Sequence, residues 1–271
     1  MIAFLKGILI GLSFLIPGLS GGTMMIVLDV FDEAIHSVNE LLHGRAYKLK
    51  KMVMIGSGTI VGIALFSPVI SFFLTNYRVL TMFFFLGVIL SSMMEIVNKV
   101  SVRPGRSFAF VKQSSFFVIG VLITVIISLF QPNYSGYTGS IDLKWILILV
   151  AAGIPVAVAL ILPGISTSYL LLTFGIYDRT LHAIKSLDIG FLLPLILGII
   201  LGTVLLTGVL EKQLRDHEQA SYLVILGFVA GSLVQLLKDF PAFNLIEFTG
   251  GLILLAIGYG LVFLLRKSVA K

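Results

Sequence analysis

Apolar residues form long, unbroken runs along this chain, and polar residues gather between the runs. A membrane-spanning helix needs about 20 apolar residues in succession. Six runs approach or exceed this length, at roughly 52–74, 79–97, 114–130, 191–210, 221–237 and 245–265. Because none of them alternates apolar with polar residues, the pattern excludes a transmembrane β-barrel. It predicts an all-α integral membrane protein.

Two further apolar runs are interrupted at a Pro-Gly pair. The first covers 2–16 and restarts at Ser20 as far as about residue 31; the second covers 145–162 and restarts at Ser166 as far as about residue 177. Proline has no N–H group and disfavours helix in the residue before it, so a helix break is expected at each pair. The segments after the breaks are too short to span a bilayer. Each interrupted run therefore predicts a re-entrant helical hairpin.

Composition supports a membrane protein and removes several chemistries. The chain is 58% hydrophobic and 12% charged, with a mean hydropathy of +1.10, whereas a soluble domain is about a quarter charged. This excludes soluble nucleotide-binding enzymes and nucleic-acid readers. The absence of cysteine excludes disulfides, thiolate nucleophiles and cysteine-based metal sites. We predict no metal and no cofactor. The first 16 residues lack an A-x-A-like cleavage site, and we interpret them as part of the mature chain.

The net charge of +6 has an explanation in membrane topology. If each hairpin leaves the membrane on the side where it entered, fourteen of the 19 Lys and Arg residues lie on one face and five on the other. Positive loops are retained in the cytoplasm. The charge pattern therefore predicts a multi-pass protein of a cytoplasmic membrane with both termini inside.

The two broken runs are related as a repeat. Aligning Pro17 with Pro163 gives five identities at one constant offset, which are Pro17/Pro163, Gly18/Gly164, Ser20/Ser166, Asp32/Asp178 and His36/His182. Further along, Gly58-xxx-Gly62 matches Gly198-xxx-Gly202, and Ser92 matches Ser232. We interpret residues 1–271 as one transmembrane domain of two repeats, roughly 1–135 and 136–271. Each repeat has a hairpin and three spans, an odd number, so the second is inverted, an arrangement typical of secondary transporters.

The hairpin tips are the first candidate binding site. After each Pro-Gly pair come small polar residues and a new helix, whose first N–H groups carry partial positive charge. Two such helix starts meeting inside the membrane would make an anion site without a buried cation. Backbone that is not helical at this depth must line a cavity or be buried in protein, and we expect these tips to be wet. The alternative is that Ser20 and Ser166 only cap their helices. The residues we assign to substrate binding are Pro17, Gly18, Ser20, Gly21, Gly22, Thr23, Pro163, Gly164, Ser166, Thr167, Ser168 and Tyr169.

Charged residues near the hairpins are candidates for gating or coupling. Asp32 with His36, and Asp178 with His182, are four residues apart and share a helix face. Such pairs can gate, relay protons or receive a counter-ion, or can simply end a helix at the interface. Asp29 is a further candidate, since it lies within an apolar segment. Arg78 and Arg179 are expected outside, where they would attract an anionic head group or anchor the chain.

The segments IPGLSGGT (16–23) and LPGISTSYLLLTFGIYDR (162–179) resemble motifs of the bacterial polyprenyl-phosphate transporters. The resemblance extends over essentially the whole chain in length and in the order of motifs. It implies recycling of undecaprenyl phosphate, a lipid carrier of cell-wall precursors, from the outer to the inner leaflet of the bacterial cytoplasmic membrane. Besides the tip residues above, it covers Tyr177 and Asp178, while Asp29 stands where the family pattern leads us to expect glycine. The partners implied are this lipid and the bilayer, with no nucleic acid, and we expect the Phe-rich segment 82–86 to contact the isoprenoid tail.

Two other functions fit parts of the pattern. PGISTS is similar to the PG-x-SRS motif of undecaprenyl-pyrophosphate phosphatases, but Thr167 occupies the arginine position and no glutamate pair lies beside the first hairpin. Without these groups, hydrolysis lacks its charge stabilisation and its acid–base catalyst, so we predict a transporter and not an enzyme. A transporter or channel for a small soluble anion would use the same helix starts. A lipid carrier differs from it in needing a cleft open to the bilayer.

Overall fold

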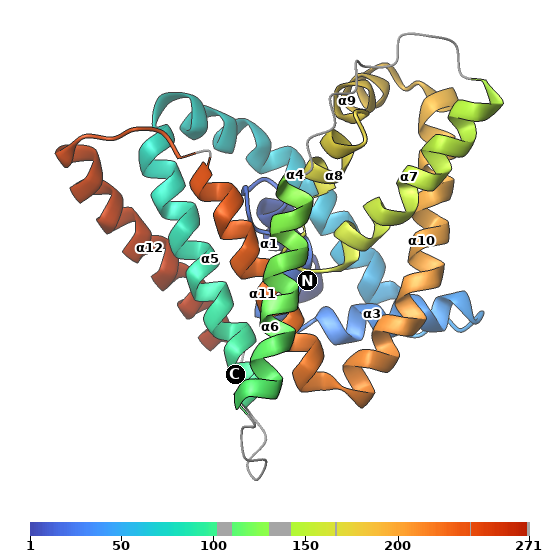
Figure 1. Ribbon diagram of the computed structural model, residues 1–271, viewed down its shortest axis with the longest axis horizontal. Coiled ribbons are helices and arrows are strands. Elements are labelled where there is room, and N and C mark those ends of the chain that lie inside the picture. Colours follow the sequence, from blue (N-terminus) through green and yellow to red (C-terminus); the bar gives the residue numbers. More distant parts are fainter. Residues whose placement is uncertain (102–109, 130–141, 166, 239, 270–271) are drawn as a thin grey trace.

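The computed structural model describes residues 1–101, 110–129, 142–165, 167–238 and 240–269, and the regular secondary structure of these residues is entirely α-helical (Figure 1). The helices are α1 (Ile2–Ser13), α2 (Gly21–Val27), α3 (Phe31–Leu42), α4 (Leu49–Asn76), α5 (Arg78–Ser101), α6 (Phe110–Leu129), α7 (Leu143–Ile161), α8 (Thr167–Thr173), α9 (Tyr177–Ser186), α10 (Ile189–Asp216), α11 (Glu218–Lys238) and α12 (Leu245–Val269).

Six of these helices are long and apolar enough to cross a membrane: α4, α5, α7, α10, α11 and α12. Helix α6 has a shorter apolar stretch, Ser114–Ile127. All six uninterrupted runs of the sequence therefore form helices, and the prediction of an all-α membrane protein is confirmed.

Both Pro-Gly breaks are present. Helix α1 ends at Ser13 and α7 at Ile161, and the glycine of each pair has a left-handed backbone, with φ of +81° at Gly18 and +84° at Gly164. Glycine adopts this conformation without the clash that a Cβ would cause. The chain then forms only a seven-residue helix, α2 or α8, at each tip.

The expectation that each restarted helix continues to about residue 31 or 177 is wrong. A second turn ends α2 and α8, and its left-handed residue is Asp29 (φ 52°) in one and Gly175 (φ 66°) in the other. The N–H of Val30 donates to the carbonyl of Met25 at 2.9 Å, and that of Ile176 to the carbonyl of Leu171 at 3.0 Å. This hydrogen bond is characteristic of helix C-caps. It redirects the chain into α3 and α9.

Glycines let the long helices pack closely in pairs. Helix α1 pairs with α4, α7 with α10, α5 with α12 and α6 with α11. A Cβ added at Gly58 would lie 2.2 Å from the carbonyl oxygen of Phe4 in α1, and one added at Gly198 would lie 2.1 Å from that of Val150 in α7. Both Gly-xxx-Gly motifs therefore serve close helix contact, as small residues do inside membranes.

We expect Gly58→Ala to destabilise the protein, because its methyl group must push α1 away from α4. Overpacking of this kind costs about 1–3 kcal/mol. Gly56→Ala is the matched control: it lies in the same helix with no atom within 4 Å of the added Cβ, and alanine is favoured over glycine in helices by about 1 kcal/mol. Thermal unfolding in detergent should show a lower Tm for Gly58→Ala and an unchanged or higher Tm for Gly56→Ala. Equal Tm values would contradict this packing.

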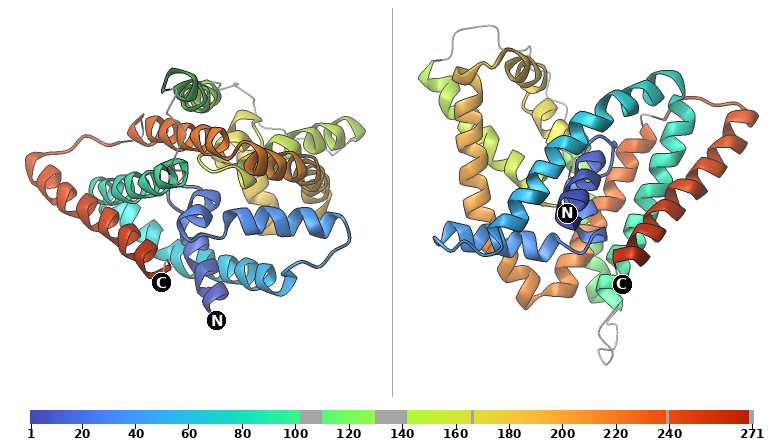
Figure 2. Two further views of the ribbon diagram at one scale, coloured as in Figure 1. Left: turned by 90° about the horizontal axis from the view of Figure 1, so that it is seen from below. Right: turned by 180° about the vertical axis from the view of Figure 1, so that it is seen from behind.

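The molecule has two distinct ends. Helix α3, the α10–α11 turn and the C-terminal ends of α5 and α12 lie at one end, the lower end in Figure 1, which we call the basic end because it bears Lys99, Lys212 and Arg266. Helix α9 and the α4–α5 turn lie at the opposite end, and the right view of Figure 2 shows the same arrangement from behind. Helix α3 packs against α10 at the basic end. Among the described residues, α9 makes no packing of similar extent against α4.

The segment 82–86 is only partly exposed, with Phe84 and Leu86 half-buried and the other three residues buried. Phe83 is 6% exposed and Phe85 fully buried. Phe83 lies edge-to-face against Phe240 and Phe243 of the segment that leads into α12, with ring centroids 5.0 and 5.7 Å apart. These rings fill the contact between α5 and its neighbours, so they offer no open surface to an isoprenoid tail.

Candidate functional site

The two hairpin tips contact each other through Ser20. Its Oγ accepts a hydrogen bond from the N–H of Gly164 in the second tip at 3.0 Å, and from the N–H of Thr23 in its own helix at 3.2 Å. The hydroxyls of Ser20 and Thr23 also lie 3.0 Å apart. Ser20 is therefore both the N-cap of α2 and a bridge between the halves of the chain, so capping accounts for only part of its contacts.

The glycines after Ser20 allow this contact. A Cβ at Gly22 would lie 3.0 Å from the carbonyl oxygen of Ile161 and 3.1 Å from Cγ of Pro163, and one at Gly21 would overlap the ring of Phe14. A side chain at Gly22 would force the tips apart, whereas one at Gly21 would displace Phe14 of the same hairpin. Gly22 thus lets the start of α2 lie directly against the second Pro-Gly turn, and Gly21 lets it lie against the end of α1.

Helix α11 forms the wall behind both tips. Ser232 is 2% exposed, and its hydroxyl donates to the carbonyl of Gly18 at 2.7 Å. Gly164 lies against the backbone of Phe228 and Val229 in the same helix. A small cavity remains between the tips and α11, lined by Gly18, Leu19, Ser20, Gly164, Ile165 and Ser232. In the sequence, Ser232 was marked only by its match with Ser92 in the repeat.

The expectation that the tips are wet is wrong for this structure. Ser20 is 7% exposed and Thr23 is fully buried, because the tips satisfy each other's polar groups instead of facing water. Pro17 is exposed, Gly18 and Thr167 are half-buried, and Pro163 and Gly164 are buried. Ser166 and the side chains of Ser168 and Tyr169 lie outside the described residues.

A first polar cluster, centred on Asp29 and Asp32, connects α3 to α5 and α11 at the basic end. Asp29 pairs with Lys99 of α5 at 2.6 Å, and Asp32 lies 3.9 Å from the same ammonium group. The hydroxyl of Tyr222 in α11 donates to both carboxylate oxygens of Asp32 at 2.9 Å. Lys6 of α1 donates to the carbonyl of Leu28 at 2.7 Å. These contacts tie the turn after α2 to the surrounding helices.

A second polar cluster connects α3 to α10. Nδ1 of His36 lies 2.6 Å from Oε1 of Glu211, and the side-chain amide of Asn39 donates to Oε2 of the same carboxylate at 2.5 Å. His36 and Asp32 share a helix face as predicted, but each finds its partner on a different helix. The sequence contained no pattern that marked Glu211, Asn39 or Tyr222, because their contacts join segments far apart in the chain.

Helix α3 is also tied to the start of α4. The carboxylate of Glu33 lies 2.9 Å from the ammonium group of Lys48 and 2.5 Å from that of Lys51. Burial favours a higher pKa for Glu33, but the hydrogen bonds and charges of Lys51 and Lys48 outweigh it and hold this pKa below its ordinary value. The hydrogen bond to Glu33 has the opposite effect on the lysine and raises the pKa of Lys48 above its ordinary value. Glu33 therefore stays ionised, and the ion pairs persist, at a pH below the ordinary pKa of glutamate.

The corresponding residues at the opposite end make fewer described contacts with other helices. His182 is exposed and lies 3.5 Å from the hydroxyl of Ser186 one turn away; the side chain of Asp178 lies outside the described residues. Arg179 pairs with Asp188 at 2.6 Å, and its guanidinium lies over the ring of Phe191. Arg78 is exposed at the start of α5. Arg179, which was expected to attract a head group, thus contacts residues close to it in the chain.

Comparison with known proteins decides the family. A family model described as undecaprenyl phosphate translocase-like matches residues 10–242. The chain belongs to this family. As expected for a member, it is similar over its whole length to a polyprenyl-phosphate transporter of Staphylococcus aureus. The two sequences are 27% identical over an alignment of 279 positions, gaps included, which covers 100% of this chain and 97% of that protein. A polyprenyl-phosphate transporter of Vibrio cholerae is 25% identical over 244 residues, 85% of this chain and 75% of the relative. No solved structure matches. The translocase-like match includes both hairpin tips and, apart from Lys6, the residues of the two clusters on α3.

Proposed function

We propose that this protein translocates polyprenyl phosphate, with undecaprenyl phosphate as its substrate, from the outer to the inner leaflet of a bacterial cytoplasmic membrane. This returns the lipid carrier to cell-wall synthesis. Membership of the translocase-like family and the names of the two relatives support the substrate. The charge pattern supports an orientation with the basic end in the cytoplasm.

The proposed architecture is two inverted repeats, each a re-entrant hairpin followed by three transmembrane helices. Several features support it. The left-handed residues Gly18 and Gly164, and then Asp29 and Gly175, recur at one constant offset. The helix pairs correspond in the same way, since α1 packs on α4 as α7 packs on α10. Transporters with such repeats bind substrate where the interrupted helices meet.

The observation that carries the proposed site is the hydrogen bond from Gly164 N–H to Ser20 Oγ. A phosphate oxygen entering between the tips would accept the Gly164 N–H in place of Ser20, and the freed Ser20 hydroxyl would donate to the phosphate. The N–H groups of Gly21 and Gly22, in the first turn of α2, have no acceptor within that helix. Phosphate binding therefore exchanges existing contacts for charge-assisted ones, which are about twice as strong as neutral hydrogen bonds.

We propose alternating access for the movement of the lipid. Helix α3 packs on α10 at the basic end and is joined to α5 and α11 through Asp32, whereas α9 makes no packing of similar extent on α4 among the described residues. These contacts support assigning the structure to a state closed toward the cytoplasm. Release into the inner leaflet requires α3 to separate from α10, which breaks the contacts of Glu211 with His36 and Asn39.

The direct test is translocation of fluorescent undecaprenyl phosphate in vesicles that contain only the purified protein. We expect the label to become accessible on the second leaflet far faster than in protein-free vesicles. Inorganic phosphate in excess should leave the rate unchanged, because a lipid substrate enters from the bilayer. A rate equal to that of protein-free vesicles would contradict the proposed function, and transport of inorganic phosphate would indicate a soluble-anion carrier instead.

A further inference from the structure

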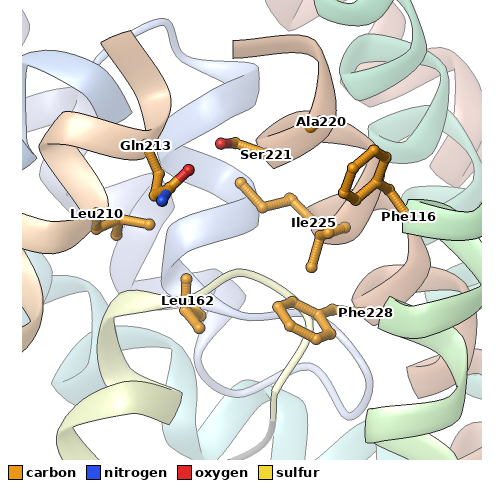
Figure 3. Close-up of a pocket in the computed structure, with 9 residues that line it drawn as sticks. Phe116, Leu162, Leu210, Gln213, Ala220, Ser221, Ile225 and Phe228 are labelled. Atoms are coloured by element: carbon orange, nitrogen blue, oxygen red, sulfur yellow. The ribbon is translucent and has the colours of Figure 1, made fainter. Parts of the chain in front are cut away.

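A pocket of about 270 Å³ lies between α6, α10, α11 and the end of α7 (Figure 3). Its walls are formed mainly by Phe116, Leu162, Leu210, Val224, Ile225 and Phe228. Its remaining lining residues are Ala220 and two polar residues, Gln213 and Ser221. Figure 3 shows Gln213 and Ser221 at the end of the pocket opposite Leu162 and Phe228. Phe116, Leu162 and Val224 are half-buried and Gln213 is exposed. The pocket is therefore apolar along its length, polar at one rim and accessible from the surface.

The pocket runs from the basic end to the second hairpin tip. Ser221, Val224, Ile225 and Phe228 are spaced three, four and seven residues apart, so they lie along one face of α11. At 1.5 Å per residue this face is about 10 Å long. At its inner end, Leu162 immediately precedes Pro163, and Phe228 is in contact with Gly164. An occupant of the pocket thus reaches the tip that donates its N–H to Ser20.

Helix packing explains why the chain leaves this space empty of its own side chains. Gly120 and Gly227 bring α6 and α11 together, and Gly153 and Gly198 bring α7 and α10 together, each with backbone in close contact. The pocket lies in the seam between these two tight pairs. A void inside a protein forfeits dispersion contacts, so in a bilayer a hydrocarbon chain is the natural filling of an apolar seam open at its side.

We propose that this pocket binds the first isoprene units of the polyprenyl chain, an assignment that rests on the function proposed above. The depth of the phosphate in the membrane distinguishes a polyprenyl phosphate from an ordinary phospholipid as the occupant. An ordinary phospholipid keeps its head group at the membrane surface, next to Gln213 and Ser221, and points its chain end toward the midplane. A polyprenyl phosphate held at the tips has the reverse arrangement: its chain starts at Leu162 and Phe228 and runs toward the basic end. The tail then already lies in the leaflet that receives the phosphate.

The test compares chains of different length. Ala220→Trp and Val224→Trp introduce an indole into the pocket from half-buried positions, and Val209→Trp places the same group on the outer surface of α10, where Val209 is 59% exposed. Binding of undecaprenyl phosphate and of geranyl phosphate is measured by competition against fluorescent undecaprenyl phosphate in vesicles. We expect the two pocket variants to bind undecaprenyl phosphate at least about tenfold more weakly, since several buried methylene groups lose their contacts. Geranyl phosphate, which has only the first two isoprene units, is expected to lose affinity by a similar factor, and Val209→Trp should match the unmodified protein.

The outcomes separate this inference from the proposed function. If the unmodified protein binds neither lipid phosphate, the proposed function fails and the tail site fails with it. If the protein translocates undecaprenyl phosphate but the pocket variants bind both lipid phosphates as tightly as the unmodified protein does, only the tail site is overturned. A photoreactive residue at position 224 gives an independent readout. It should crosslink polyprenyl phosphate, and displacement of that crosslink by phosphatidylglycerol would identify an ordinary phospholipid site and overturn the assignment.

Discussion

Replacing Ser20 with leucine abolishes transport while the protein remains folded in the membrane, if the tips bind the phosphate as proposed. Ser20 Oγ is the acceptor for the N–H of Gly164 and of Thr23, and it has almost no exposed surface. Leucine removes that acceptor and fills the space between the tips. Ser20→Ala is milder: it keeps the space between the tips but removes the hydroxyl that would donate to the phosphate, and a hydrogen bond to a charged group contributes about 1.5–3 kcal/mol. We expect transport by Ser20→Ala to fall by about tenfold or more in the vesicle assay.

Ser13→Ala provides the matched control for Ser20→Ala. Ser13 belongs to the same hairpin and is fully buried, but its hydroxyl donates to the carbonyl of Ile10 within its own helix at 2.7 Å. The same atoms are therefore removed without touching the contact between the tips. Membrane levels and Tm of each variant separate misfolding from loss of the site. Normal transport by Ser20→Leu, in protein of normal abundance, would show that the phosphate does not pass between the tips.

The spans and the breaks between them could be predicted because they depend on local chemistry. Runs of apolar residues set the long helices, and proline disrupts helix wherever it lies in such a run. The continuation of α2 and α8 was predicted wrongly for a local reason too. Gly175 is a recognisable stop signal, but Asp29 adopts the same left-handed backbone without being glycine, and an aspartate inside an apolar run gives little indication of a turn.

The candidate site could be predicted only as far as the tips themselves. Their composition indicated a polar break inside the membrane, but whether the tips face water or each other depends on how the two halves dock. The partners of Asp32 and His36 illustrate the same difficulty. Tyr222 and Glu211 lie far along the chain on α11 and α10, and one sequence has no periodicity that connects them to α3. Long-range polar contacts of this kind follow from tertiary packing.

Locking α3 to α10 should stop transport reversibly, because release at the basic end requires these helices to separate. A Cβ built at Gly208 of α10 lies 3.5 Å from Oδ1 of Asn39, so cysteines at positions 39 and 208 are close enough for a disulfide or a short thiol crosslinker. The chain has no cysteine of its own, so Asn39→Cys with Gly208→Cys forms the only thiol pair. We expect oxidation to reduce translocation in vesicles by about tenfold or more, and a reducing agent to restore it.

A crosslink between helices that remain together provides the control. Leu80 of α5 and Gly250 of α12 are also adjacent, with Cδ2 of Leu80 lying 3.3 Å from a Cβ built at Gly250, and these two helices pack along their length. Oxidised Leu80→Cys with Gly250→Cys should transport at the rate of its reduced form, since alternating access leaves this pair intact. If the crosslink at positions 39 and 208 forms completely and transport continues unchanged, α3 and α10 do not part during the cycle. Glu211, His36 and Asn39 would then be a fixed brace of the basic end and not its gate.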